Sequence, residues 1–225
     1  MTIIQAVLAT LAFLCILLLA TALDVIIWRK KLGTLAPWIN LLSLGSLSVA
    51  FFLAMKDATG IQPGFTPITL VDLLFSVVSS LVLFLLLDRG LDPLLEKRFP
   101  GSEAKYQEAL VTLRKSPYAS SIHVVLLGPA VEELLMRGFI LNGLLETQGV
   151  CGALILSSVL FALLHFNMVQ TLSAVIAGLV LGILYLYTGS VFSTLITHSL
   201  YNFLSYYRSP PRTDLKTSRS DASWE

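Results

Sequence analysis

Four polar side chains interrupt long apolar stretches of this sequence: Glu132, His165, His198 and Asn202. An ionisable group at the depth of a lipid bilayer costs roughly 2.5–3.5 kcal/mol on insertion scales, so each one needs a reason to be there. His198 and Asn202 are four residues apart and therefore share one face of a helix. A carboxylate and two imidazoles exchange protons, and an amide donates hydrogen bonds. The four groups would form an acid–base site if they converged on one cavity.

Two neighbouring carboxylates, Glu132 and Glu133, begin the most charged part of these stretches. They point about 100° apart around a helix, so one partner cannot serve both. Glu133 and Arg137 are spaced i,i+4, and we predict an internal ion pair that lowers the cost of both charges. Pro129 removes a backbone donor one turn earlier and loosens the helix there. A structural ion pair explains Glu133 and Arg137 but leaves Glu132 unexplained.

The composition predicts that these residues are carried by membrane helices. Of the 225 residues, 56% are hydrophobic and 13% are charged, about half the charged fraction of soluble proteins, and the mean hydropathy is +0.81. Lys and Arg lie in short groups beside the apolar runs, which excludes a nucleic-acid partner. We predict an all-α, polytopic bundle of about seven transmembrane helices. The predicted spans are 3–28, 35–55, 68–87, 124–145, 150–166, 169–187 and 190–207.

The basic residues predict the orientation of the bundle. All Lys and Arg except Lys56 and Arg137 fall into three groups that seven spans would place on one side of the membrane. By the positive-inside rule, the N-terminus is then outside and the C-terminus cytoplasmic. The predicted parts are three N-terminal spans (1–87), a cytoplasmic interfacial connection of two short amphipathic helices (88–117), a four-helix core that carries the site (118–207) and a disordered tail (208–225).

Small residues in the predicted span 169–187 indicate close helix packing. Gly178 and Gly182 are four residues apart, with Ala174 one turn earlier. This spacing lets two helix backbones approach each other in a membrane. We expect this span to hold the site-bearing helices together.

The polar residues resemble those of the CPBP family of intramembrane proteases, which includes the CAAX prenyl endopeptidases and bacteriocin-processing and self-immunity proteins. The family pattern is EExxxR, FxxxH and HxxxN on successive apolar segments. Its counterparts here are Glu132-Glu133-xxx-Arg137, Phe161-xxx-His165 and His198-xxx-Asn202. The resemblance covers about residues 118–207 and has no departure at the motif positions.

The resemblance implies an intramembrane endopeptidase that hydrolyses a peptide bond of a membrane-associated protein or peptide. Glu132 would be the general base that activates water, and His165 would help to hold that water. His198 and Asn202 would stabilise the tetrahedral oxyanion. We accordingly expect a peptide or membrane-protein substrate, a lipid bilayer around the helices, and a place in the cell membrane of a prokaryote.

The sequence leaves the metal requirement open. Glu132, His165 and His198 form a Glu/His/His set that could hold zinc and leave a fourth position for water. The HExxH motif of helical zinc sites is absent, which favours a mechanism without a tightly bound metal. Glu133 with Arg137 would support the helix that presents Glu132 rather than bind a ligand.

Two other functions compete with proteolysis. A catalytically idle scaffold or bacteriocin immunity protein would bind a peptide partner through the same cavity. A small transporter or proton relay also places Glu and His inside a membrane, but such folds are often built from repeats, and the sequence shows no convincing repeat. Neither the substrate nor the oligomeric state follows from the sequence.

Overall fold

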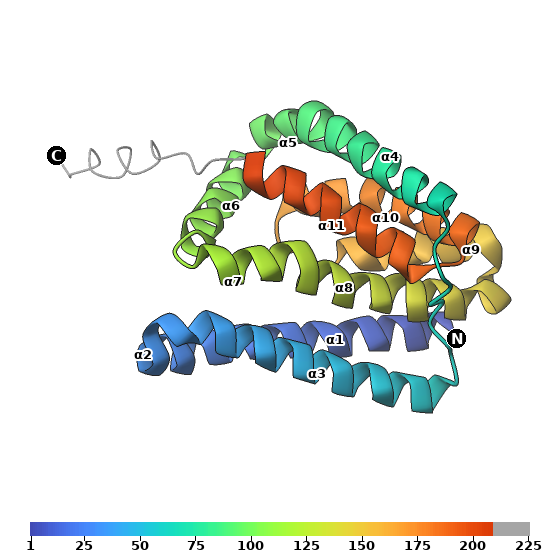
Figure 1. Ribbon diagram of the computed structural model, residues 1–225, viewed down its shortest axis with the longest axis horizontal. Coiled ribbons are helices and arrows are strands. Elements are labelled where there is room, and N and C mark those ends of the chain that lie inside the picture. Colours follow the sequence, from blue (N-terminus) through green and yellow to red (C-terminus); the bar gives the residue numbers. More distant parts are fainter. Residues whose placement is uncertain (209–225) are drawn as a thin grey trace.

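The computed structural model describes residues 1–208, and within this part of the chain it contains helices and no strand (Figure 1). The all-α prediction is confirmed. The tail predicted for 208–225 lies, apart from Arg208, outside the described residues. The α-helices are α1 (Ile3–Leu23), α2 (Arg29–Leu32), α3 (Ala36–Thr59), α4 (Leu70–Leu86), α5 (Asp92–Arg98), α6 (Pro100–Leu113), α7 (Pro117–Ile122), α8 (Gly128–Glu133), α9 (Asn142–Ala162), α10 (Met168–Thr188) and α11 (Val191–Arg208).

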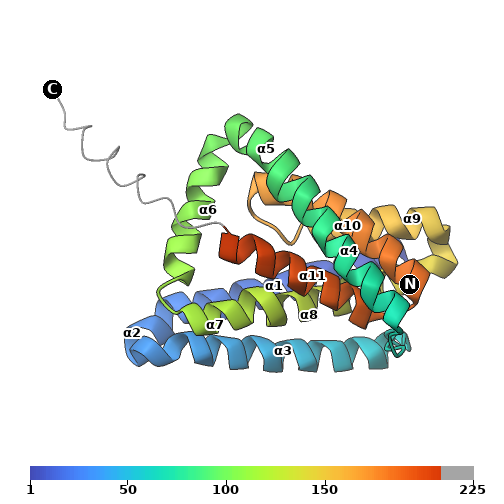
Figure 2. The ribbon, with the colours of Figure 1, turned by 45° about the horizontal axis from the view of Figure 1, so that its top comes forward.

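Two glycines reverse the direction of long helical stretches. Gly33, with φ of 50°, turns the chain so that α1 and α3 lie side by side and antiparallel (Figures 1 and 2). Gly149, with φ of 67°, divides α9 into two parts. A positive φ costs a side chain with a Cβ more than it costs glycine, so glycine suits both reversals.

Four helical stretches are long and apolar enough to cross a membrane. They are Ile3–Thr59, Leu70–Arg98, Pro117–Ala162 and Met168–Thr188. These stretches support an integral membrane protein, because each exceeds the length that a hydrocarbon core of about 30 Å requires. The first and third stretches each contain one of the two reversals, so the number of stretches is not the number of membrane crossings. The predicted count of seven spans and the predicted orientation therefore stay predictions.

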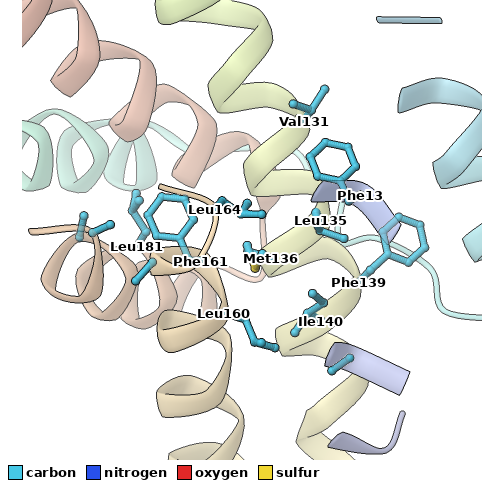
Figure 3. Packing of buried hydrophobic residues seen from close by; sticks show 14 of the residues in the cluster. Phe13, Val131, Leu135, Met136, Phe139, Ile140, Leu160, Phe161, Leu164 and Leu181 are labelled. Carbon is cyan, nitrogen blue, oxygen red and sulfur yellow. The ribbon is translucent and has the colours of Figure 1, made fainter. Parts of the chain in front are cut away.

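The buried core lies where the second half of the chain meets the N-terminal pair of helices (Figure 3). Phe139 follows the site-bearing helix α8 and stacks on Phe52 of α3, with ring centroids 5.7 Å apart. Phe52 in turn stacks on Phe13 of α1 at 5.8 Å. The aromatic contacts fix the N-terminal pair against the part of the chain that carries the polar residues.

Three π-helical segments lie in the second half of the chain or lead into it: Leu87–Leu91, His123–Leu127 and Leu134–Leu141. The second directly precedes Pro129, whose ring clashes with the carbonyl four residues earlier in a regular α-helix. A wider π turn gives the ring more room than an α turn does. The predicted loosening of the helix at Pro129 is therefore present as a π segment.

The connection between α4 and α7 contains two short helices, α5 and α6, as the amphipathic pattern predicts. In Figure 2, α5 lies at the top and α6 descends from it to the start of α7, near α2. Their place at a membrane interface stays a prediction.

Gly178 and Gly182 of α10 lie directly against α9, as the small-residue pattern predicts. A Cβ added at Gly178 would meet Cα and Cβ of Ser158 at 2.9 Å, and one added at Gly182 would clash with Leu154 Cδ1. The neighbour of Gly178 is backbone, which cannot swing away as a flexible side chain can.

We predict that Gly178→Ala destabilises the protein by about 1–3 kcal/mol, because overpacking forces the two backbones apart. Thermal unfolding of the full chain in detergent measures the loss. Gly101→Ala is the matched control, since nothing lies within 4 Å of a Cβ at that position. An equal change in both variants would contradict the close approach of α9 and α10.

Candidate active site

One cavity of about 520 Å³ is lined by Glu132, His165, His198 and Asn202. These are the four residues that the sequence singles out for chemistry. They come from α8, from the loop that follows α9, and from α11, and the cavity brings them to one space. The convergence that the sequence could only suggest is thus present in the fold.

The predicted ion pair of Glu133 and Arg137 is present and fully enclosed. Glu133 Oε1 accepts from Arg137 Nη1 at 2.8 Å, and the two side chains are 0% and 1% exposed. Arg137 Nη2 also donates to the carbonyl of Gly178 at 3.0 Å. The guanidinium carbon lies 4.8 Å from the centroid of the Phe161 ring. Arg137 therefore links the site-bearing helix to α9 and α10.

Glu133 has a second partner that the sequence did not reveal. Its Oε1 lies 2.8 Å from Nδ1 of His198, which is itself 5% exposed. An ionised carboxylate can only accept, so Nδ1 carries the proton of this bond. Glu133 thereby fixes the plane of the imidazole and leaves Nε2 for other partners. The available signal was that a carboxylate buried in apolar surroundings needs hydrogen-bond partners.

Glu132 faces the cavity instead of the interior of the ion pair. Its side chain is 22% exposed, whereas that of the adjacent Glu133 is 0% exposed. Glu132 Oε2 lies 3.9 Å from His198 Nε2, beyond a hydrogen bond but within ion-pair range. The predicted divergence of the two carboxylates is therefore observed, with one neutralised inside the protein and one open to the cavity.

The Phe161 ring lies between three charged or polar side chains. It contacts His165 edge to face at 5.2 Å and His198 at 5.7 Å, in addition to Arg137. His165 follows the end of α9, and its Nδ1 lies 3.2 Å from the carbonyl of Phe161. The ring thus sets the spacing of the two imidazoles on one wall of the cavity.

Asn202 is held by a carbonyl that Pro129 leaves without a helical partner. In the π segment before Pro129, Gly128 N–H donates five residues back to His123. The next carbonyl, that of Val124, would need the N–H of Pro129, which does not exist. Asn202 Nδ2 donates to this carbonyl at 2.9 Å. An amide nitrogen carries two protons, so a second N–H is left for the cavity.

The lining of the cavity also includes acidic residues, which the sequence did not place there. Asp88, Asp92 and Glu103 line it, and the first two accept hydrogen bonds from Ser205 and Ser173. Burial, together with the nearby carboxylates, raises the pKa of Tyr106 to about 12, so this phenol stays protonated at neutral pH. The segment 88–117 thus closes over the site, where the sequence predicted only an interfacial connection.

The residues predicted as a possible zinc set do not form a metal cluster in this arrangement. Among residues 1–208, no group of three or more His, Cys, Asp or Glu side chains is placed to hold a metal ion. We derive no step through a metal.

A comparison with models of protein families gives a match to the segment that carries the site residues. Residues 114–204 match the model described as type II CAAX prenyl endopeptidase Rce1-like. This part of the chain is similar to that family. The resemblance read from the three motifs is confirmed, since all three lie within the Rce1-like segment. The family is one of membrane proteases. No curated protein and no solved structure gave a match.

Proposed function

We propose that the protein is an intramembrane endopeptidase in which Glu132 activates a water molecule to hydrolyse a peptide bond. The observation that carries the proposal is the open carboxylate of Glu132 in a cavity that His165, His198 and Asn202 also line. The Rce1-like match over residues 114–204 supports a peptidase. The cation groups support a cavity that opens toward the cytoplasm.

In the proposed mechanism, Glu132 is the general base. Its carboxylate is open to the cavity, with the side chain 22% exposed, so that a water molecule can reach it. His165 lines the same cavity and would hold the attacking water through its ring. Glu132 takes the proton as the water oxygen bonds to the carbonyl carbon, and passes it on to the leaving amine.

In the same mechanism, His198 and Asn202 stabilise the oxyanion. Asn202 retains an N–H after its bond to Val124, and its position is fixed by that bond. His198 is held through Nδ1 by Glu133, so that Nε2, when protonated, can donate to the developing charge. Donors fixed before the reaction stabilise the charge without reorganising during it.

We predict that Asn202→Ala lowers kcat by about 10²–10³-fold with little change in KM, as the loss of one oxyanion donor does. Peptide cleavage by the variant in vesicles measures the effect. Asn142→Ala is the control, because Asn142 makes a similar bond from its side chain to a carbonyl, that of Gln62, at an exposed position away from the cavity. Unchanged kcat in Asn202→Ala would remove this residue from the mechanism.

The substrate class can be tested with a prenylated peptide that ends in a CAAX sequence, because the matched family is described as a CAAX prenyl endopeptidase. The purified full chain in vesicles is expected to cleave it, and Glu132→Ala is not. The same peptide without the prenyl group shows whether the lipid contributes. An idle scaffold would bind the peptide equally with and without Glu132 and cleave it in neither case.

A further inference from the structure

A second cavity, of about 310 Å³, lies apart from the active site, between the N-terminal helix pair and the α6–α7 connection. Its polar lining includes Asp24, Arg29, Asn40, Lys115 and His123. The cavity lies at the end of the molecule where α2 and the start of α7 approach each other (Figure 2). None of the residues proposed for catalysis lines it.

Asp24 is the least satisfied charge in this cavity. It is 3% exposed, and its Oδ2 accepts from Arg29 Nε at 2.6 Å. Its other oxygen, Oδ1, is buried and has no hydrogen-bond partner. The side-chain oxygen of Asn40 in the same cavity is likewise buried without a partner. Buried acceptors cost free energy until a donor reaches them, so the cavity favours a ligand with several N–H groups.

The same cavity also offers positive charge. Lys115 lines it, and Arg29 lines it with a side chain that is 52% exposed. A purely cationic ligand would be repelled by these groups, and a purely anionic one by the carboxylate of Asp24. A compact zwitterion satisfies both signs, with an ammonium for the acceptors and a phosphate for the cations.

The cavity lies at a level suited to lipid headgroups. Arg29, Lys30 and Lys31 follow the apolar α1, and Trp28 and Trp38 flank the reversal at Gly33. Basic residues and tryptophans at the ends of apolar helices are typical of the membrane–water boundary. A zwitterion at this level is most directly supplied by a phospholipid.

We propose that this cavity binds the headgroup of a phosphoethanolamine lipid, with the ammonium against Asp24 and Asn40 and the phosphate against Lys115 and Arg29. A choline headgroup has no N–H to donate, and a glycerol headgroup has no positive charge. The site is independent of the proposed proteolysis. It would join α3 to the end of α6, the helix that also forms part of the active-site wall.

The test compares phosphatidylethanolamine, phosphatidylcholine and phosphatidylglycerol with identical acyl chains, added to the full chain in detergent and measured by native mass spectrometry. We expect phosphatidylethanolamine to bind about tenfold more tightly than the other two, the difference that one or two charge-assisted hydrogen bonds supply. Asp24→Asn is expected to remove the preference. Lys115→Gln is expected to weaken the binding of all three lipids, because each carries the phosphate assigned to Lys115. Lys31→Gln, which removes a neighbouring cation that does not line the cavity, is expected to keep both the preference and the affinity.

Lys115 is exposed, so Lys115→Gln gives a result even if Asp24→Asn does not fold. Equal binding of the three lipids would overturn the proposal, as would a preference that Asp24→Asn retains or an affinity that Lys115→Gln leaves unchanged. Soluble phosphoethanolamine, added as a competitor, distinguishes the sources of the headgroup. If it displaces the lipid at equal concentration, the site takes a free solute and the assignment to a lipid is wrong.

Discussion

Glu132→Gln is expected to lower kcat/KM for peptide cleavage by about 10²–10⁴-fold, the range that a positioned general base contributes. Glutamine keeps the length and the hydrogen-bonding oxygen of the side chain but cannot take a proton from water. The fold should tolerate the change, because the carboxylate is open to the cavity and its Oε2 lies 3.9 Å from His198 Nε2, which is beyond a hydrogen bond. The loss therefore reports chemistry rather than unfolding.

Cleavage of a peptide by the full chain in vesicles measures this effect, with thermal unfolding as the check on folding. Glu146→Gln is the matched control, since Glu146 is an exposed carboxylate on α9 beyond the cavity. We expect the control to keep wild-type activity. If Glu132→Gln also keeps it, the water is activated by another group and the proposed mechanism is wrong.

The helices could be predicted from sequence because a membrane span requires about 20 consecutive apolar residues, a constraint that local composition obeys. The helices observed follow the predicted segments closely, and Gly33 and Gly149 fall between segments that the apolar runs already separated. Whether each segment crosses the bilayer does not follow in the same way. It depends on how the helices pack and on the lipid around them.

The local parts of the site could also be predicted. The pair of Glu133 and Arg137 follows from i,i+4 geometry within one helix, which needs no tertiary structure. The bond between Glu133 and His198 joins residues 65 positions apart and depends on how α8 packs against α11. The sequence indicates only that a buried carboxylate needs a partner, because its burial is costly. It does not indicate which residue that partner is.

The amphipathic pattern of segment 88–117 did not predict what its polar face contacts, and the reason is physical. Amphipathic spacing shows that a helix has one polar face but not what that face meets. The acidic side of α5 and α6 could face water at a membrane surface. In the structure, Asp92 and Glu103 line the active-site cavity instead. Packing against α10 and α11 determines whether this face meets water or the cavity. That packing cannot be predicted from the local sequence.

Arg137→Met is expected to destabilise the protein by about 3–5 kcal/mol, because it leaves Glu133 as a buried charge without its cation. Methionine fills much of the volume of the arginine stem, so the loss reflects charge more than a cavity. The guanidinium also bonds to Gly178 and lies over Phe161, and both contacts disappear. Thermal unfolding of the full chain in detergent measures the change. Arg89→Met is the control, since it removes an exposed cation that lies over Phe84 at 5.8 Å.

The double variant Glu133→Gln with Arg137→Met separates charge from packing. It leaves no buried charge in the pair, and replacing both members of a buried ion pair is often close to neutral. Glutamine can still accept from His198 Nδ1, so the imidazole keeps its orientation. We therefore expect the double variant to recover most of the lost stability and to retain measurable cleavage. If it is as unstable as Arg137→Met alone, the contacts of the guanidinium with Gly178 and Phe161 stabilise the core, and Glu133 needs no cation to remain buried.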